Sequence, residues 1–467
     1  MAIAAGTFAA TAVASSTTRH STTTIRSVEQ STSTAVEGIA VIRRGTTTTS
    51  TASKVSSAQP SAGSSTVAAP VIAVTTAAPS TTAVPAPPPL PALVYQSASE
   101  FGLVAAGIAQ RAASADPNFA GAWIDGANIL HLASAGDPTT LIGIAAQSGI
   151  STAVEARPTP RSRLLEVRND IAARAYELAG DGLSLVAVSI ADAPNAVRVT
   201  GQIIDPASQD RLRAHYPDVA IEVHAILDGA VAVRGNPRSS ATLGLHGGMV
   251  ISPAARPSFR CVAGFPVSTS RGPGVLTAGH CGLAGERFLL GNGPGTAALG
   301  TVAARVNDGP NVASWSGQRV TATDTELIDT ATNADDVLFD DRSLPIRGVL
   351  TNPVVGQVIY AALGRSGSTT PGRVTEVDVI TIGSPNGEMP TTTHNIGISN
   401  CGAPGDSGSP VVAPDSSGHV RAIGLVIAAP DSQCDPNALA TEHESEQYVS
   451  LLQPSLDALS AHIVERP

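Results

Sequence analysis

After residue 244 the chain alternates short runs of strand-forming residues with glycine-rich turns, almost to its C-terminus. Such runs occur at 262–267, 274–277, 358–361, 374–382 and 422–427. Helical periodicity returns only at 451–463. Many short strands separated by turn signals are typical of an all-β barrel or sandwich. We therefore predict an all-β unit over residues 244–467 with a closing C-terminal helix.

Residues 96–240 have a different pattern. Apolar residues follow helical spacing up to a stop at Gly180: Leu164, Val167, Ile171, Ala175 and Leu178. Strand-like runs follow at 185–190 and 196–200, joined by a turn-like sequence at 192–195. Asp205 and Pro206 are typical of a helix start, so we expect a helix to His215 and then a strand at 219–223. This order predicts a small α+β module with its helices on one face of a sheet.

The N-terminal part is built largely of Ser, Thr, Ala and Pro between residues 9 and 91. Such a composition buries too little apolar surface to offset chain entropy, so residues 1–95 are predicted to be a disordered leader. The sequence Ala12, Val13, Ala14 matches a signal-peptide cleavage pattern. A positively charged start is missing, so these residues fit an extension of the leader equally well.

Charge and cysteine content exclude several classes of function. The net charge is −10 and no basic stretch is present, which argues against nucleic-acid binding. The sequence contains no run of 18 or more apolar residues, so no membrane-spanning helix is predicted. The four cysteines, Cys261, Cys281, Cys401 and Cys434, are not at zinc spacing, so no metal site is expected. Two disulfides in an exported protein explain them most simply, with three possible pairings.

Three short sequences in the β region contain the residue types that nucleophilic catalysis needs. Residues 276–281 read Leu-Thr-Ala-Gly-His-Cys, residues 323–328 read Thr-Asp-Thr-Glu-Leu-Ile, and residues 401–410 read Cys-Gly-Ala-Pro-Gly-Asp-Ser-Gly-Ser-Pro. A serine hydroxyl is a poor nucleophile at neutral pH and needs a base within hydrogen-bond reach. Histidine titrates in the right range, and a carboxylate on its other nitrogen fixes its tautomer and stabilises the imidazolium.

The first and last of these sequences together resemble the chymotrypsin-like serine endopeptidases, most closely the bacterial streptogrisin and α-lytic branch, over roughly the last half of the chain. The resemblance implies two six-stranded antiparallel β-barrels and peptide-bond hydrolysis through an acyl-enzyme, without a cofactor. It assigns Ser407 as the nucleophile, His280 as the general base and acid, and Asp324 as the orienting carboxylate. Asp308 and Asp329 stay open as alternatives to Asp324.

Further residues follow from the same resemblance. The backbone N–H groups of Gly405 and Ser407 would form the oxyanion hole, where glycine permits the loop geometry. The family pattern implies the disulfides Cys261–Cys281 and Cys401–Cys434. Asp406 needs a partner if it is buried, and Arg365 lies in a Gly-Arg-Ser-Gly stretch like the one that supplies this partner in the bacterial branch. An Arg365–Asp406 ion pair is therefore expected, with Arg365 as a solvated turn residue the alternative.

The substrate-binding strand departs from the family pattern. The family runs to Ser-x-Gly where this chain has Ile427, Ala428 and Ala429. Backbone hydrogen bonds to an extended substrate are still expected there. Ile427 removes a polar neighbour of the catalytic aspartate, Ala429 narrows the mouth of the pocket, and Ser409 replaces a glycine. The sequences around Ser399–Asn400 and Val426 offer no acid and no histidine, so a small or modest apolar side chain is expected at the cleaved bond.

The 96–240 module resembles the pro-region of the same branch through residues 116–125 and its later helix and strand order. This implies a module that assists folding and inhibits until it is cut off near 239–248, the alternative being a permanent accessory domain. The chain is thus predicted to be a secreted, monomeric serine endopeptidase precursor. Its partners would be protein or peptide substrates and its own pro-module in cis. A catalytically inactive binding protein on a protease fold is the rival prediction.

Overall fold

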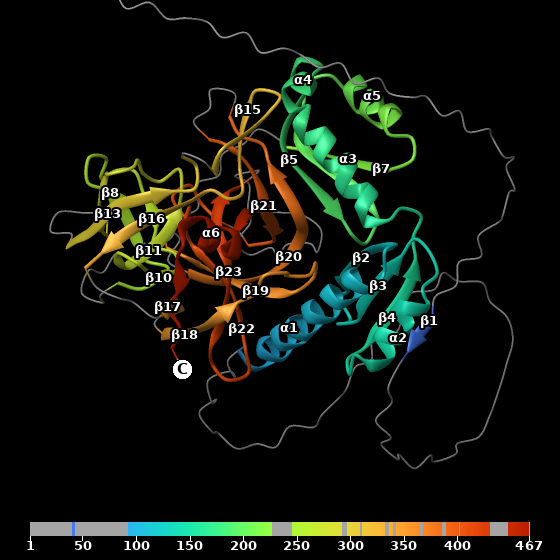
Figure 1. Ribbon diagram of the computed structural model, residues 1–467, viewed down its shortest axis with the longest axis horizontal. Coiled ribbons are helices and arrows are strands. Elements are labelled where there is room, and N and C mark those ends of the chain that lie inside the picture. The colour runs from blue at the N-terminus through green and yellow to red at the C-terminus, as the bar shows by residue number, and fades with distance from the viewer. Residues whose placement is uncertain are drawn as a thin grey trace, which may run out of the picture. The chain divides into compact units, whose positions relative to one another are not determined.

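The computed structural model describes residues 40–42, 92–226, 245–291, 297–308, 311–331, 336–339, 342–364, 368–384, 389–400, 402–429 and 447–466. Strands predominate in this part of the chain (Figure 1). Most of the predicted leader and residues 239–244 of the predicted junction lie outside the described residues. No helix in the described ranges is both long and apolar enough to cross a membrane.

The first barrel is formed by strands between residues 250 and 330. They are β8 (Val250–Pro253), β9 (Cys261–Val262), β10 (Pro266–Thr269), β11 (Gly272–Ala278), β12 (Arg287–Leu290), β13 (Ala297–Arg305) and β16 (Thr325–Thr330). Antiparallel pairing runs in the order β10, β11, β16, β13, β12, β8, β9. Because β9 and β10 lie on one stretch of chain, this order closes a ring of six strands. Closure removes the exposed sheet edges that would otherwise invite aggregation.

The second barrel closes in the same way. Its strands are β19 (Val358–Leu363), β20 (Ser368–Thr381), β21 (Thr391–Ile398), β22 (Pro410–Pro414), β23 (Val420–Ala428) and β24 (Gln447–Leu451). Antiparallel pairing follows the order β19, β20, β21, β24, β23, β22 and returns to β19. Two six-stranded antiparallel barrels, as predicted, are therefore confirmed.

Helix α6 (Leu452–Leu459) follows the second barrel and packs through the buried Leu452 and Leu456. The predicted helix to residue 463 is too long. Ser460 has a left-handed backbone, with φ of 49°, which ends the helix. The chain then forms β25 (His462–Ile463), which pairs with β10 of the first barrel. Two hairpins complete this half: β14 (Ala313–Trp315) with β15 (Gln318–Thr321), and β17 (Asp336–Phe339) with β18 (Arg342–Val349).

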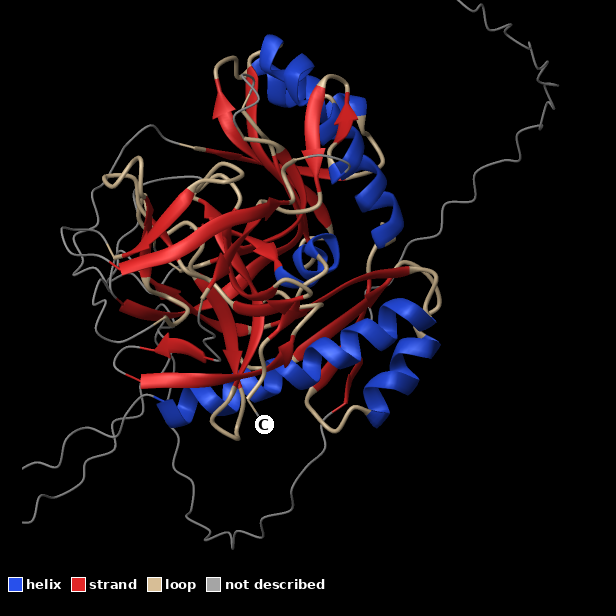
Figure 2. Ribbon diagram, turned by 60° about the vertical axis from the view of Figure 1, so that its left-hand side comes forward, coloured by secondary structure: helices blue, strands red, loops and turns tan. Residues whose placement is uncertain are grey.

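Residues 92–226 form two parts, each with strands covered by helices, and these helices lie at the right-hand side of Figure 2. The first part has a four-stranded sheet of its own, whereas the strands of the second part extend a sheet of the second barrel. The first contains α1 (Ala92–Ala115), β2 (Phe119–Ile124), β3 (Leu130–Ser134), α2 (Thr139–Gln147) and β4 (Thr152–Ala156), with β1 (Ala40–Ile42) paired to β4. Buried Ile108 of α1 and Leu141 of α2 belong to one core with Leu132 of β3. No element of this first part was predicted from the sequence.

The second part contains the elements that the sequence predicts for 163–223, in the predicted order. They are α3 (Arg161–Ala173), α4 (Ala175–Gly180), β5 (Leu183–Ala191), β6 (Ala196–Ile203), α5 (Ala207–His215) and β7 (Ala220–Ala225). Their apolar faces share one core, in which Leu164 and Leu212 pack with Val199. The single helix predicted over 163–178 is instead broken at Arg174. Its backbone N–H is shared between Asp170 O and Ile171 O, and its side chain pairs with Glu177.

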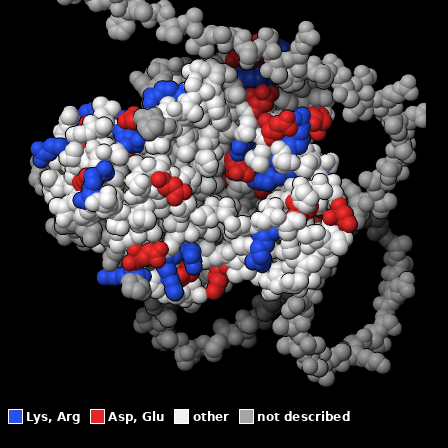
Figure 3. All heavy atoms as spheres, viewed as in Figure 1, with Lys and Arg blue, Asp and Glu red and all other residues white. Residues whose placement is uncertain are grey.

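Strand β5 joins this part to the second barrel, because it pairs antiparallel with β20. Charged side chains of both signs gather over this region, around α3 (Figure 3). Arg161 of α3 contacts Asp192 and also Asp378 of β20. Arg198 of β6 donates from Nη1 to Glu376 Oε1 of β20 at 3.0 Å, and both side chains are less than a tenth exposed. The contact between the two segments is thus both a β-ladder and a set of buried ion pairs.

Replacing Arg198 by methionine is expected to lower the free energy of unfolding by about 3–5 kcal/mol, because Glu376 would remain buried without its main cationic partner. The control is the double variant Arg198→Met/Glu376→Met, which leaves neither charge buried and should lose much less stability. Urea denaturation of the two variants and the wild type measures both values. A single variant as stable as the double variant would contradict this energetic role.

Candidate active site

The structure brings His280, Asp324 and Ser407 to one place between the two barrels. His280 lies two residues after the end of β11, and Asp324 directly precedes β16. These two strands are neighbours, with Ala278 opposite Thr325. Ser407 lies in the turn before β22 of the second barrel. Its carbonyl oxygen accepts the N–H of Val262 at 2.8 Å, which ties this turn to the first barrel.

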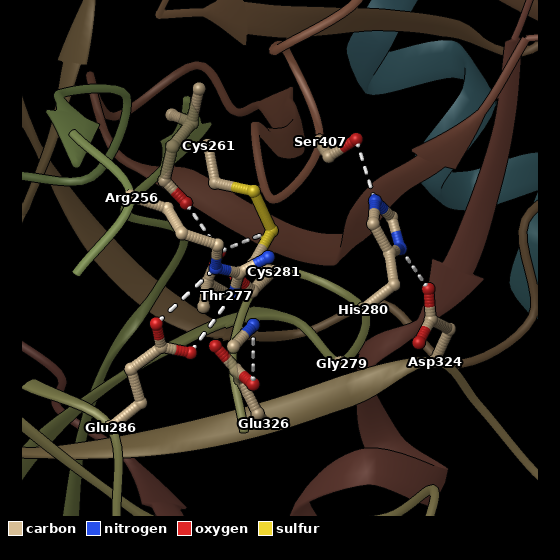
Figure 4. Close-up of a disulfide and its surroundings, with 12 residues drawn as sticks. Arg256, Cys261, Thr277, Gly279, His280, Cys281, Glu286, Asp324, Glu326 and Ser407 are labelled. Carbon is tan, nitrogen blue, oxygen red and sulfur yellow. Dashed lines mark hydrogen bonds and ion pairs between the residues drawn. A yellow bond between two sulfur atoms is a disulfide. The ribbon is translucent and has the colours of Figure 1, made fainter. Parts of the chain in front are cut away.

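The three side chains form one hydrogen-bonded chain, which Figure 4 shows. His280 Nδ1 lies 2.5 Å from Asp324 Oδ2, and His280 Nε2 lies 2.9 Å from Ser407 Oγ. A carboxylate only accepts hydrogen bonds, so Nδ1 carries the proton and Nε2 of the neutral ring accepts from the serine hydroxyl. The alternative carboxylates are elsewhere: Asp308 pairs with Arg305, and Asp329 pairs with Arg271. Of the three candidates, Asp324 is the one that faces the histidine.

The electrostatics favour a charged Asp324. Burial acts to raise its pKa, but the charge of His280 and hydrogen bonds from His280 and Asn307 outweigh burial, and the pKa is lowered. The same kinds of effect act on His280, but in the opposite direction. Burial acts to lower its pKa, whereas the charge of Asp324 and its hydrogen bond raise the pKa above the ordinary value. Each group therefore stabilises the charged form of the other.

Asp324 has two polar neighbours that the sequence did not reveal. Asn307 donates from Nδ2 to Asp324 Oδ1 at 2.6 Å, and the backbone N–H of Asp324 donates to Ser450 Oγ at 3.1 Å. Ser450 in turn donates to Asn395 Oδ1. These residues lie 17 and 126 positions away from Asp324 and belong to no recognisable motif. Sequence reasoning had no signal by which to find them.

The turn that carries Ser407 has the backbone geometry that an oxyanion hole needs. Gly405 has φ of 100°, a conformation that is strained for any residue with a Cβ. Asp406 accepts the N–H of Ala403 through Oδ2 and donates its own N–H to Ala403 O, both at 2.9 Å. Among the described residues, neither Gly405 N–H nor Ser407 N–H has an acceptor. Both donors are thus available to a bound group.

The predicted partners of this turn are described only in part. Asp406 is buried, with 1% of its surface exposed, but Arg365 lies outside the described residues. Cys401 and Cys434 also lie outside them, so their pairing stays a prediction. The structure does link Cys261 to Cys281, beside His280 (Figure 4).

Glu326, the acidic residue of the Thr-Asp-Thr-Glu-Leu-Ile sequence, is fully buried. Gly282 donates its N–H to Glu326 Oε2 at 3.2 Å, and Arg305 Nε lies 3.7 Å from the same oxygen. Arg305 also donates to Gly279 O at 2.7 Å. Burial raises the pKa of Glu326 well above its usual range. The Arg305–Glu326 pair thus holds the backbone on both sides of His280.

The predicted substrate residues lie at the end of β23. Ile427 is 3% exposed because Ala187 of β5 and Tyr448 belong to the same core, while Ala428 is half-buried and Ala429 is exposed. Ile427 and Ala428 line a cavity of about 300 Å³ together with Asp324. Residues of β5 and of the turn between β20 and β21 complete its wall. Ser409 is buried and accepts the N–H of Gly364.

Comparison with known proteins gives structural matches only. No protein family matches the sequence, and no curated protein matches it. A Nocardiopsis protease covers 47% of this chain and 97% of its own, at 19% identity and a TM-score of 0.33. Cellulomonas bogoriensis chymotrypsin covers 47% and 98%, at 21% identity and a TM-score of 0.34. An α-lytic protease homolog, N4, covers 46% and 97%, at 23% identity and a TM-score of 0.33.

Proposed function

We propose that this protein is a serine endopeptidase that hydrolyses peptide bonds through an acyl-enzyme intermediate. The observation that supports this best is the continuous hydrogen-bonded chain from Ser407 through His280 to the buried Asp324. A nucleophile in contact with a base, and a base oriented by a third group, is the arrangement that activates a serine hydroxyl. The chain order His, Asp, Ser agrees with the resemblance seen in the sequence.

In this mechanism Ser407 Oγ attacks the carbonyl carbon of the substrate while His280 Nε2 takes the hydroxyl proton. Asp324 stabilises the imidazolium that forms. The negative charge on the substrate oxygen is stabilised by the N–H groups of Gly405 and Ser407, which have no other acceptor among the described residues. His280 then gives its proton to the leaving amine. In the second half of the reaction His280 takes a proton from water, which attacks the acyl group, and returns that proton to Ser407 Oγ as the acid product leaves.

Residues 96–240 are proposed to act as a pro-module that assists folding and inhibits in cis. Strand β5 supports this proposal, because it pairs with β20 and supplies Leu185 and Val186 to the cavity that Asp324 and Ile427 line. Removal near 239–248 would be required for full activity. Secretion agrees with the Cys261–Cys281 disulfide, since disulfides persist in oxidising compartments. Small or modest apolar residues remain the proposed preference at the cleaved bond.

A fluorophosphonate probe tests the proposed function directly, since it reacts only with an activated serine. We expect labelling of the wild type and of Ser417→Ala, an exposed control, and none of Ser407→Ala. Intact mass should show one adduct, on a fragment that begins near residue 240–248. If the chain stays intact and unlabelled, trace external protease is added and the labelling is repeated. A cut, folded chain that still does not react would contradict the proposal and favour a binding protein.

Activity should fall at acid pH with a midpoint above about 6.5, the ordinary value for histidine. The base form of His280 is the neutral ring, and protonation removes it. Because Asp324 raises the pKa of His280, the protonated ring persists to a higher pH than in a free histidine. Rates of probe labelling across the pH range measure this midpoint. A flat profile, or a midpoint well below 6.5, would show that His280 is not the base.

A further inference from the structure

We infer that Asn307 is a positioning residue for the catalytic carboxylate, an inference that rests on the proposed function of the Ser407–His280–Asp324 site. Asn307 Nδ2 lies 2.6 Å from Asp324 Oδ1, the oxygen that does not face His280. Both side chains are buried, each with 2% of its surface exposed. A buried donor to a charged acceptor is among the strongest hydrogen bonds in a protein, and it leaves Asp324 little freedom to turn away.

The backbone around Asn307 fixes this contact from two sides. The N–H of Val306 donates to Thr325 O at 2.9 Å, which aligns the end of β13 with the residue next to Asp324. Arg319 Nη2 donates to Asn307 O at 2.6 Å. The amide side chain is therefore presented to the carboxylate by a held backbone and not by a mobile loop.

The orientation of the amide follows from chemistry. An ionised carboxylate cannot donate, so the amide nitrogen and not its oxygen must face Asp324. Asn307 Oδ1 is then buried without a partner among the described residues. An unsatisfied buried oxygen costs stability, so this side chain is not explained by its contribution to folding. Among the described residues, the one polar contact of this side chain is the carboxylate of Asp324.

The space for this contact depends on Gly279, the residue before His280. A Cβ at position 279 would lie 2.7 Å from Asn307 Nδ2 and 2.8 Å from Asp324 Oδ1. A side chain there would enter the hydrogen bond itself. The glycine of the Ala-Gly-His-Cys sequence thus leaves room for the amide to reach the aspartate.

Asn307 also accounts for the apolar residue at 427. The sequence resemblance places a serine there as a polar neighbour of the aspartate, and Ile427 cannot fill this role. Ile427 and Asp324 line the same cavity, so the two positions are close in this structure. The donor that Ile427 lacks is supplied by Asn307, in the turn that follows β13. Asn307 thus takes the place, from a different part of the fold, of the serine that the resemblance expects at position 427.

Steady-state hydrolysis and probe labelling of the full chain, activated by trace protease, test the role of Asn307. In Asn307→Ala we expect kcat and the labelling rate to fall by about 10- to 100-fold, the value of one hydrogen bond to a charged group, with KM little changed. Asn307→Asp fills the same space but repels Asp324, and should lose at least as much. If Asn307→Ala does not fold, the rates of Asn307→Asp decide whether Asn307 positions Asp324. Asn352→Ala, an exposed control, should keep wild-type rates.

Two further readouts separate positioning from a general structural effect. The double variant Asn307→Ala/Ile427→Ser returns a hydroxyl donor near Asp324 and should recover part of the lost kcat. In a Ser407→Ala background, the downfield proton resonance of the His280–Asp324 hydrogen bond should shift or disappear on Asn307→Ala and stay with Asn352→Ala. A labelling rate within twofold of wild type, or an unchanged resonance, overturns the inference. If the wild type is never labelled, the proposed function fails and the resonance alone decides the role of Asn307.

Discussion

Ser407→Ala is expected to lower kcat for peptide hydrolysis by about 10⁶-fold after activation by trace protease. Alanine has no nucleophile, so no acyl-enzyme can form at this position. The hydroxyl also donates a hydrogen bond to His280 Nε2, 2.9 Å away, and the substitution removes this contact. Any residual rate would come from water attacking a substrate held by the oxyanion donors Gly405 and Ser407, whose backbone N–H the variant keeps. Burst kinetics with an activated ester measures both the acylation step and turnover.

The strongest test of a shared mechanism is non-additivity. When residues act as one unit, replacing one of them lowers kcat about as much as replacing all of them. The kcat of His280→Ala/Ser407→Ala should therefore agree with that of Ser407→Ala within a few fold. Ser417→Ala provides the matched control, since Ser417 is exposed and contacts Asp415 and His419. Additive losses, with the double variant slower by the product of both effects, would mean that His280 and Ser407 act independently.

The members of the hydrogen-bonded chain could be predicted from the sequence because they lie in short motifs that resemble those of a known family. Ala-Gly-His-Cys and Gly-Asp-Ser-Gly pointed to His280 and Ser407. The alternation of strands and turns indicated only an all-β barrel or sandwich, and the two barrels followed from the resemblance. Asp324 was less secure, with Asp308 and Asp329 as alternatives. What decided between the three was the register of β11 with β16, which sets Ala278 opposite Thr325 and so places Asp324 beside His280. Asp329 lies at the other end of β16, opposite Gly274. No local sequence pattern encodes this register.

The contacts that the sequence did not predict all join segments far apart in the chain. Asn307 reaches Asp324 from the turn after β13, and β5 pairs with β20 nearly two hundred positions later. The first sheet of the 92–226 region, with α1 as its longest helix, was missed for another reason. That helix is rich in alanine and has no charged residue in its first or last turn, so its ends carry no electrostatic signal.

The Arg305–Glu326 pair gives a fully buried acidic residue a structural role beside His280. In the sequence Glu326 follows Asp324 by two residues, and nothing there indicates that its side chain is buried. In the structure Glu326 binds Gly282 N–H while Arg305 binds Gly279 O, so the two side chains secure the segment that carries His280. Burial raises the pKa of Glu326, while the charge of Arg305 acts to lower it.

Asp324→Asn is expected to lower kcat by about 10⁴-fold at neutral pH with little change in fold. An amide facing His280 Nδ1 would donate to it, which places the ring proton on Nε2. That nitrogen then cannot accept the proton of Ser407, and the charge that stabilises the imidazolium is gone. Asp329→Asn is the matched control, because Asp329 is partly exposed and pairs with Arg271 at the surface, and it should stay within twofold of wild type. The pH profile adds a second test: the acid-side midpoint set by the Asp324–His280 pair should move to lower pH in Asp324→Asn, since the negative charge that raises the pKa of His280 is removed. An unchanged midpoint would mean that a different carboxylate orients the histidine.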